Sequence, residues 1–227
     1  MSKENKHNNS EGDKFQQIVV TCSEYMKKNR EKVTLVGVLL IVSLALVVGL
    51  AYYAGQVDAK GAQAFGKIQA SFADGVAKEG REATLTRFLA RADATLTSLK
   101  GSSSYPGALM WLGGLALEKG EYDRAATWFG FAADEFDTVS SMKNIAWCCQ
   151  GQALEEGGSL DKASEFYEKV RASGSEVKWV EATFFMARIE EMKGNLESAK
   201  VLFREVAESG GQSSYQEMAK EKLYPSL

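Results

Sequence analysis

An unbroken apolar run from Val33 to Tyr53 constrains this chain more than any other feature of its sequence. No charged residue occurs between Lys32 and Asp58. A helix of about 20 apolar residues is long enough to cross the roughly 30 Å hydrocarbon core of a bilayer. The alternative is a core helix of a soluble protein, but such helices are usually shorter and keep a polar face. The sequence therefore predicts a transmembrane helix over residues 33–54.

The flanks of this run predict its orientation. Four basic residues lie within residues 27–32, whereas the 20 residues after Tyr53 hold only two. The positive-inside rule then places the N-terminus in the cytoplasm and the rest of the chain outside it. A cleaved signal peptide is the alternative, but the preceding segment is long and Ala51-Tyr52-Tyr53-Ala54 is a poor cleavage site. We therefore expect an uncleaved signal anchor.

Composition and charge limit what the remaining residues can do. The chain has 27 basic and 30 acidic residues, of which residues 1–32 hold seven and five, so the rest carries a net charge of −5. A mildly acidic domain argues against nucleic acid as a partner, because nucleic-acid binding favours a basic patch. Proline occurs only twice and helix-forming residues dominate. We therefore predict an all-α domain.

Two segments with different patterns precede the apolar run. Residues 1–14 are almost entirely polar, and we expect a disordered cytoplasmic tail. Residues 15–32 place apolar side chains at helical spacing ahead of the basic cluster. This pattern predicts an amphipathic juxtamembrane helix on the inner membrane surface, with a solvated linker as the alternative.

Beyond the span, residues 56–101 predict an antiparallel helix pair. Apolar residues recur at three- and four-residue spacing over residues 62–76 and again over 85–99, with Gly80 in the turn between them. A Gly-Ser-rich loop then leads to Pro106, which suits the first turn of the next helix.

Residues 106–212 contain three copies of one pattern, offset by 38 and 36 residues. Self-similarity at this period indicates stacked helix pairs, each of which covers the apolar face of its neighbour. The glycine permits the turn, the small residue and the alanine mark the closest approach of the paired helices, and the aromatic residue fills the space between successive repeats. Each copy contains, in chain order, the small residue, the glycine, the alanine, the aromatic residue and a final small or β-branched residue. The three sets are Gly113, Gly120, Ala125, Phe129 and Ala132; Gly151, Gly158, Ala163, Tyr167 and Val170; and Ala187, Gly194, Ala199, Phe203 and Val206.

This spacing resembles the tetratricopeptide repeat (TPR). Leu112 precedes the small residue in the first copy as in the family, whereas Gln150 and Met186 depart from it, and no copy has the closing proline. The helix pair of residues 56–101 resembles a degenerate fourth repeat, and residues 213–227 resemble the helix that caps such arrays. The resemblance implies a TPR-like α-solenoid of antiparallel helix pairs.

The whole layout is similar to that of YfgM-type ancillary subunits of the bacterial SecYEG translocon. A basic tail, one signal anchor, a helix pair, a loop bearing Tyr105 and a short repeat array occur in the same order. The resemblance implies a single-pass inner-membrane protein whose periplasmic domain links the translocon to chaperones or secreted client proteins. Two other functions stay open, namely a scaffold for cell-envelope assembly or division, and a TPR protein that binds a lipid or small molecule.

The sequence contains no recognisable catalytic, cofactor or metal motif. His7 is the only histidine and lies in the N-terminal tail, so no His-based triad or His-containing zinc site can form outside. Carboxylate pairs such as Glu155-Glu156 are typical of solvated helix faces. We therefore predict no enzyme, no cofactor and no metal.

Two neighbouring cysteines, Cys148 and Cys149, lie in the first helix of the second repeat. An oxidising compartment favours disulfides, but a bridge between adjacent helical residues would strain the backbone. We predict two small buried side chains instead.

The TPR resemblance also suggests where partners bind. The first helices of the pairs line a concave face with an apolar floor and more acid than base, which favours an extended or helical segment with some positive charge. The alternative is that the array's own helices cover part of this face. Two small-xxx-small patterns within residues 45–55 suggest a homodimer through the span, although chance produces such patterns often. The predicted groove residues are Met110, Leu117, Glu118, Ile145, Cys148, Gln152, Glu181, Phe184, Arg188 and Glu191.

Overall fold

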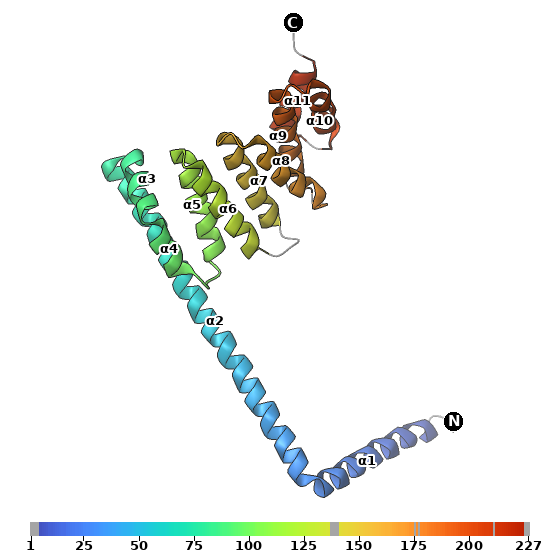
Figure 1. Cartoon of the computed structure of the whole chain (residues 1–227). Coiled ribbons are helices and arrows are strands. Elements are labelled where there is room, and N and C mark those ends of the chain that lie inside the picture. Colours follow the sequence, from blue (N-terminus) through green and yellow to red (C-terminus); the bar gives the residue numbers. More distant parts are fainter. Residues whose placement is uncertain (1–4, 137–140, 175, 177, 211, 225–227) are drawn as a thin grey trace. The chain divides into compact units, whose positions relative to one another are not determined.

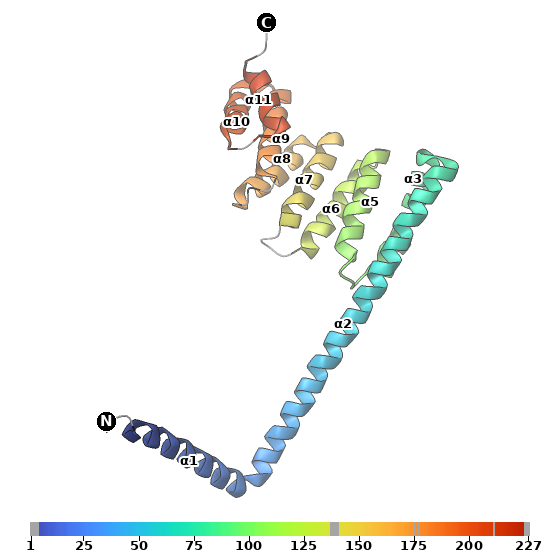
Figure 2. The ribbon, with the colours of Figure 1, turned by 180° about the vertical axis from the view of Figure 1, so that it is seen from behind.

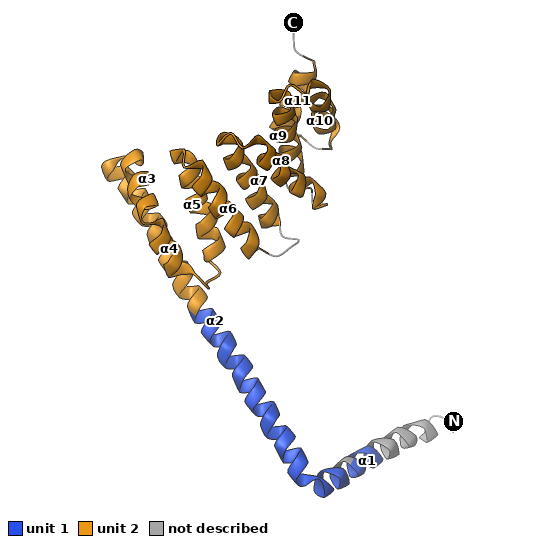
Figure 3. Ribbon diagram, in the orientation of Figure 1, with its two compact units in different colours: residues 1–56 blue, residues 57–227 orange. Residues whose placement is uncertain are grey.

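The structure of the chain is a computed structural model that describes residues 5–136, 141–174, 176, 178–210 and 212–224, with side chains from residue 16 onward except Cys22. Within these ranges the chain forms eleven helices and no strand (Figure 1). It divides into two compact units, residues 1–56 and 57–227, and the boundary lies within the second helix (Figure 3). The prediction of an all-α chain is confirmed.

The first unit contains α1 (Asn5–Lys28) and the beginning of α2 (Arg30–Glu79). Helix α1 begins at Asn5, so it includes residues 5–14, and residues 1–4 lie outside the described part. The disordered tail expected over residues 1–14 stays a prediction. Extending a formed helix adds one hydrogen bond per residue, so the amphipathic segment can carry a polar extension. Only Asn29 separates the two helices, and both its backbone N–H and its side-chain amide donate to the Tyr25 carbonyl.

The apolar run forms one continuous helical stretch of α2. By length and composition, α2 is the one helix of the described chain that could cross a membrane. Its large apolar side chains between Leu35 and Tyr53 are all more than half exposed. The hydroxyls of Thr34 and Ser43 donate to backbone carbonyls three or four residues earlier, so these polar groups are satisfied within the helix.

The second unit begins with the remainder of α2, which packs against α3 (Arg81–Ala90), α4 (Ala92–Leu99) and α5 (Tyr105–Lys119). Phe72 makes edge-to-face contacts with Phe88 of α3 and with Trp111 of α5, with ring centroids 5.1 and 5.4 Å apart. The second helix of the predicted pair is broken at Arg91, whose N–H donates to the Phe88 carbonyl. These contacts attach the degenerate pair to the first repeat.

Three helix pairs then follow in register with the predicted repeats, and each helix packs against the next in the chain (Figure 2). A cluster of core residues in the first half and another in the second half both reach Trp147 and Leu154 of α7, so the apolar interior is continuous. The array is therefore the expected TPR-like α-solenoid. Its pairs are α5 with α6 (Tyr122–Glu135), α7 (Ser141–Glu156) with α8 (Leu160–Ala172), and α9 (Trp179–Met192) with α10 (Leu196–Glu208).

The repeated glycines and small residues have the roles predicted for them. Gly120, Gly158 and Gly194 adopt left-handed φ angles of 81°, 78° and 81° in the turns between paired helices. A Cβ atom on Gly113 would lie 2.7 Å from the Phe129 ring, and one on Gly151 would lie 2.6 Å from the Tyr167 ring. These aromatic side chains therefore pack within their own repeat, whereas the pattern had placed them between successive repeats. The small residue is therefore required for the close approach of the two helices.

The last helix, α11 (Ser214–Leu223), occupies the first-helix position of a further repeat. Ala219 follows Ala182 by 37 residues, and both are fully buried at the same place in the repeat. The position of the small residue is taken by Tyr224, which is 74% exposed. A large side chain at this position disfavours a close second helix, which agrees with the predicted capping helix.

Candidate functional site

The predicted groove residues lie on the three first helices α5, α7 and α9, but their exposure differs. Glu118 is exposed, whereas Cys148 and Phe184 are buried, with 2% and 5% of their surface accessible. The other seven predicted residues are half-buried. Contacts with neighbouring helices decide which of them a partner could reach.

Helix α3 covers the start of the predicted groove. The Arg81 guanidinium donates two hydrogen bonds to the Glu118 carboxylate, and the hydrogen bond from Arg81 lowers the pKa of Glu118. Met110 and Leu117 pack against the first core cluster. The three predicted residues of α5 are therefore engaged by the protein itself.

Helix α11 covers the other end of the groove. The ring of Tyr215 packs on Phe184 with centroids 5.3 Å apart, and the Lys222 ammonium pairs with Glu191 at 2.7 Å. Burial and the neighbouring Glu181 raise the pKa of the Tyr215 hydroxyl. Phe184 thus belongs to the aromatic core of the third repeat, which favours the alternative that the array covers this side chain itself.

One predicted residue, Arg188, belongs to a buried polar network between the second and third repeats. Glu155 of α7, whose side chain is 5% exposed, accepts hydrogen bonds from the Tyr167 hydroxyl at 3.0 Å and from Arg188 Nε at 2.9 Å. Arg188 also stacks over the Phe185 ring at 4.9 Å. Burial raises the pKa of Tyr167 first, and the Glu155 carboxylate raises it further. The network joins three helices and leaves the carboxylate fully paired.

Sequence reasoning missed the role of Glu155, because it assigned the Glu155-Glu156 pair to a solvated face. Only Glu156 is exposed. The signal that could have found this site is the spacing of four residues from Gly151 to Glu155, since residues four apart share one face of a helix. That face points toward the second helix of the repeat, where Tyr167 lies.

Each predicted acidic residue of the face has a basic partner. Glu118, Glu181 and Glu191 pair with Arg81, Lys178 and Lys222 respectively, and Glu155 pairs with Arg188. The face is therefore close to charge balance, although the residue types of the predicted lining had indicated an excess of acid. The basic partners come from other parts of the fold, so counting the lining residues alone could not find them.

The two cysteines border the same region as free thiols. Cys148 is buried and Cys149 is half-buried. Burial raises the pKa of both thiols. The prediction of two small buried side chains therefore holds for Cys148, whereas Cys149 is only half-buried.

The accessible part of the face lies on α7 and α9. Ile145 is half-buried and belongs to neither core cluster, and Gln152 and Arg188 are also partly exposed. Three cavities of the domain lie elsewhere, between α10 and α11, between the start of α9 and residues 209–210, and among α2, α3 and α4. No group of three metal-ligating side chains occurs in the described part of the chain.

Comparisons with known proteins add little to this description. No family model matches the chain, and no curated protein matches it. Among solved structures it is similar to one titled "Functional Characterization of Pseudomonas Aeruginosa pilF", at 16% sequence identity and a TM-score of 0.43, over 75% of this chain and 93% of that chain. The assignment of the fold rests on the repeat geometry described above.

Proposed function

We propose that this chain is a single-pass membrane protein anchored by the apolar part of α2. The uncharged length of the run, its exposed side chains and its internally satisfied hydroxyls all support a lipid environment. The basic residues before the run favour a cytoplasmic N-terminus and an uncleaved anchor. The exposed apolar side chains of α1, among them Ile18 and Tyr25, suit the inner membrane interface. The repeat domain then lies in the periplasm.

We further propose that the repeat domain is a non-enzymatic scaffold that binds other proteins through α7 and α9. The observation that carries this proposal is Ile145, a half-buried apolar side chain of α7 that belongs to neither core cluster. The acidic residues predicted for the same face already have basic partners. A partner segment that covers this surface buries apolar area and leaves no charge without a partner. An extended or helical peptide segment has the right shape for such a face.

At a finer level, we infer an adaptor that links the Sec translocon to chaperones or secreted clients. The support is the order of the tail, the anchor, the helix pair and the short array, which resembles the YfgM-type ancillary subunits. A periplasmic array next to its own anchor can hold a soluble protein close to a membrane complex. This role needs no catalytic residue.

The test is recovery of partners from gently solubilised membranes by the full chain and two variants. Ile145→Arg introduces a charge on the proposed binding face, and we expect it to lose its partners. Val201→Arg, on the exposed surface of α10, is the matched control and should recover the same partners as the unaltered chain. Thermal unfolding of both variants should stay close to that of the unaltered chain.

Different outcomes contradict different parts of the proposal. If Ile145→Arg folds and still recovers every partner, the face on α7 and α9 is not the binding surface. If translocon subunits and chaperones are absent from the recovered proteins, the adaptor role is wrong while a scaffold role stands. If the full chain recovers no protein at all, the scaffold itself is contradicted.

A further inference from the structure

The loop between α4 and α5 is attached to α2 close to the point where the apolar run ends. The Ser103 backbone N–H donates to Asp58 Oδ1 at 2.7 Å. Gly61 is buried against Ser102, and a Cβ atom on this glycine would lie 2.4 Å from the serine Cβ. The Ser102 side chain is itself held in place, because its hydroxyl donates to the Leu99 carbonyl at 2.7 Å. Residues 100–104 are thus held against one short stretch of helix.

Chain connectivity limits how far this loop can lie from the span. Asp58 is the first charged residue after the run. It follows Tyr53 by five residues, and a chain extends by at most about 3.5 Å per residue, so the two lie within roughly 18 Å of each other in any conformation. The hydrogen bond to Ser103 places the loop within a few ångströms of Asp58. If α2 is the anchor proposed above, residues 100–104 lie at or just above the lipid headgroups.

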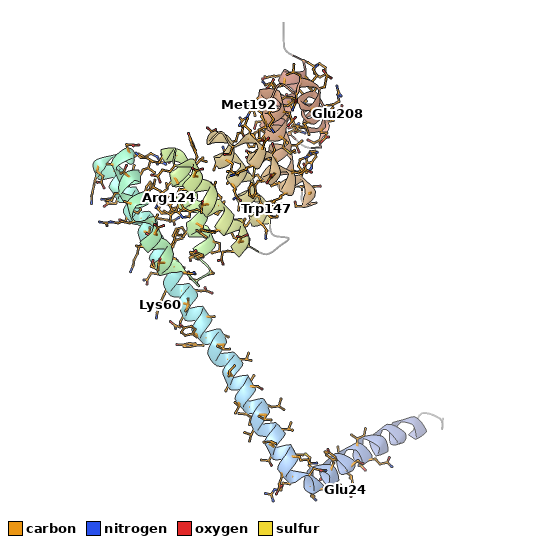
Figure 4. The ribbon with its side chains drawn as sticks, viewed as in Figure 1. Glu24, Lys60, Arg124, Trp147, Met192 and Glu208 are labelled. Atoms are coloured by element: carbon orange, nitrogen blue, oxygen red, sulfur yellow. The ribbon has the colours of Figure 1, made fainter. Side chains whose placement is uncertain are left out.

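The side chains around this attachment suit a phosphate-bearing surface. Lys60 and Lys100 are exposed, and Ser103 is exposed between Ser102 and the half-buried Ser104. Figure 4 shows Lys60 on α2 near the end of α4. The carboxylate of Asp58 is already engaged by the loop backbone. Ammonium and hydroxyl groups donate well to phosphate oxygens, and lysines close to an anionic lipid surface are attracted to it.

We propose that residues 100–104, together with Lys60 and Lys100, form a membrane-contact surface that binds the phosphates of phospholipid headgroups. This inference rests on the proposed membrane anchor. The surface fixes the first helix pair at the bilayer, so that the repeat array is presented from a defined base and is not tethered by one helix alone. Its ligand is the headgroup layer of the leaflet into which the repeat domain emerges.

The experiment measures contact with lipid on the full chain in bilayers. In a Cys22→Ser background, a fluorophore is attached at Ser103→Cys or at Asp123→Cys, which lies in the first turn of α6. The native thiols at residues 148 and 149 are buried or half-buried with raised pKa values, so they label slowly. A quencher carried by the lipid headgroups should quench the label at residue 103 and leave the label at residue 123 bright.

Neutralising the lysines tests the chemistry of the contact. We expect the double variant Lys60→Gln and Lys100→Gln to lower the equilibrium constant for membrane contact about 25-fold in anionic bilayers. Each lysine near such a surface raises that constant about fivefold. The control is Lys162→Gln, an exposed lysine of α8, which should change nothing. Inorganic phosphate, compared with chloride at equal ionic strength, should not displace the contact, because the partner is the lipid surface.

The outcomes separate this inference from the anchor on which it rests. If the chain does not float with the bilayers after alkaline extraction, the proposed anchor is wrong. If the chain floats but the two labels are quenched equally, or neither is quenched, the membrane-contact surface is overturned and the anchor stands. Unchanged quenching in the double lysine variant, with unchanged thermal unfolding, overturns the assignment of the two lysines.

Discussion

Two adjacent glycines in α5 show how the repeat depends on single residues. Gly113 lies against the Phe129 ring, whereas a Cβ on Gly114 would meet nothing within 4 Å. Alanine at residue 113 overpacks the helix crossing, and we expect it to lower the free energy of unfolding by about 1–3 kcal/mol. Alanine at residue 114 should raise it by about 0.5–1 kcal/mol, because glycine disfavours a helix interior. Urea denaturation of both variants measures the difference.

The backbone context of these two positions is nearly identical, so each variant is the control for the other. If alanine at residue 113 leaves stability unchanged or raises it, the crossing of α5 and α6 is not as close as described. The sequence pattern alone identified Gly113 as the constrained position, because the small residue recurs in every repeat. The pattern could not show that Gly114 has open space for a side chain.

The buried hydroxyl of Tyr167 offers a second residue-level test. Tyr167→Phe removes the hydrogen bond to Glu155 and leaves part of that buried carboxylate without a donor. We expect a loss of about 1–3 kcal/mol in the free energy of unfolding. Tyr122→Phe is the control, since the described structure gives the Tyr122 hydroxyl no hydrogen bond, and it should cost less than about 0.5 kcal/mol. Equal losses in thermal unfolding would contradict the network.

The ion pair between Arg81 and Glu118 predicts a pH dependence. Its hydrogen bond lowers the pKa of Glu118 in the folded protein. A carboxylate with a lowered folded pKa contributes stability above its ordinary pKa of 4.5, and that contribution is lost as the pH falls through the folded value. We therefore expect Glu118→Gln to be less stable than the unaltered chain at pH 7. The difference should disappear in acid, and a gap that persists or widens there would exclude this carboxylate as its source.

At the level of elements, the two serine N-caps of α8 and α11 differ in a way that only the structure shows. The Ser213 side chain accepts from the Gln216 N–H, and the Gln216 side chain accepts from the Ser213 N–H, which completes a capping box. The side chain of Ser159 makes no such bond. We expect Ser213→Ala to cost about 0.5–2 kcal/mol and Ser159→Ala much less. Thermal unfolding measures both, and a larger effect at residue 159 would contradict the capping box.

Most elements could be predicted from the sequence because their limits depend on local chemistry. Left-handed glycines such as Gly120 end first helices, and small residues mark helix crossings. The break at Arg91 could not be predicted, because no glycine or proline marks it. The sequence also could not predict that α11 covers α9. That packing depends on contacts between residues far apart in the sequence, such as the one between Lys222 and Glu191, which are 31 residues apart.

At the scale of the whole molecule, the fold was easier to predict than the site. The order of the helices follows from periodicity, whereas the accessible surface depends on which faces the terminal elements cover. Helix α3 engages Glu118 and α11 buries Phe184, so only the middle of the expected groove stays accessible. A short array has few repeats between its two ends, and each end covers part of the surface that the pattern alone leaves open.

The basic flank before the apolar run predicts the orientation of the whole chain. A reporter that folds only in an oxidising compartment, fused after Leu227, should be active, and the mature N-terminus should be Met1 or Ser2. The physical reason is the cluster of four basic residues within residues 27–32, which resists transfer across the membrane. A chain that begins near Ala54 would contradict the uncleaved anchor.

Charge reversal supplies the control for that orientation. Replacing the four basic residues of the cluster with glutamate, while adding lysines directly after Tyr53, should move the reporter to the cytoplasm and abolish its activity. The same number of substitutions on exposed positions of α8 should leave the reporter active. If the reversed chain keeps its orientation, the flanking charges do not determine the topology. In that case the placement of the repeat domain outside the cytoplasm would need another cause.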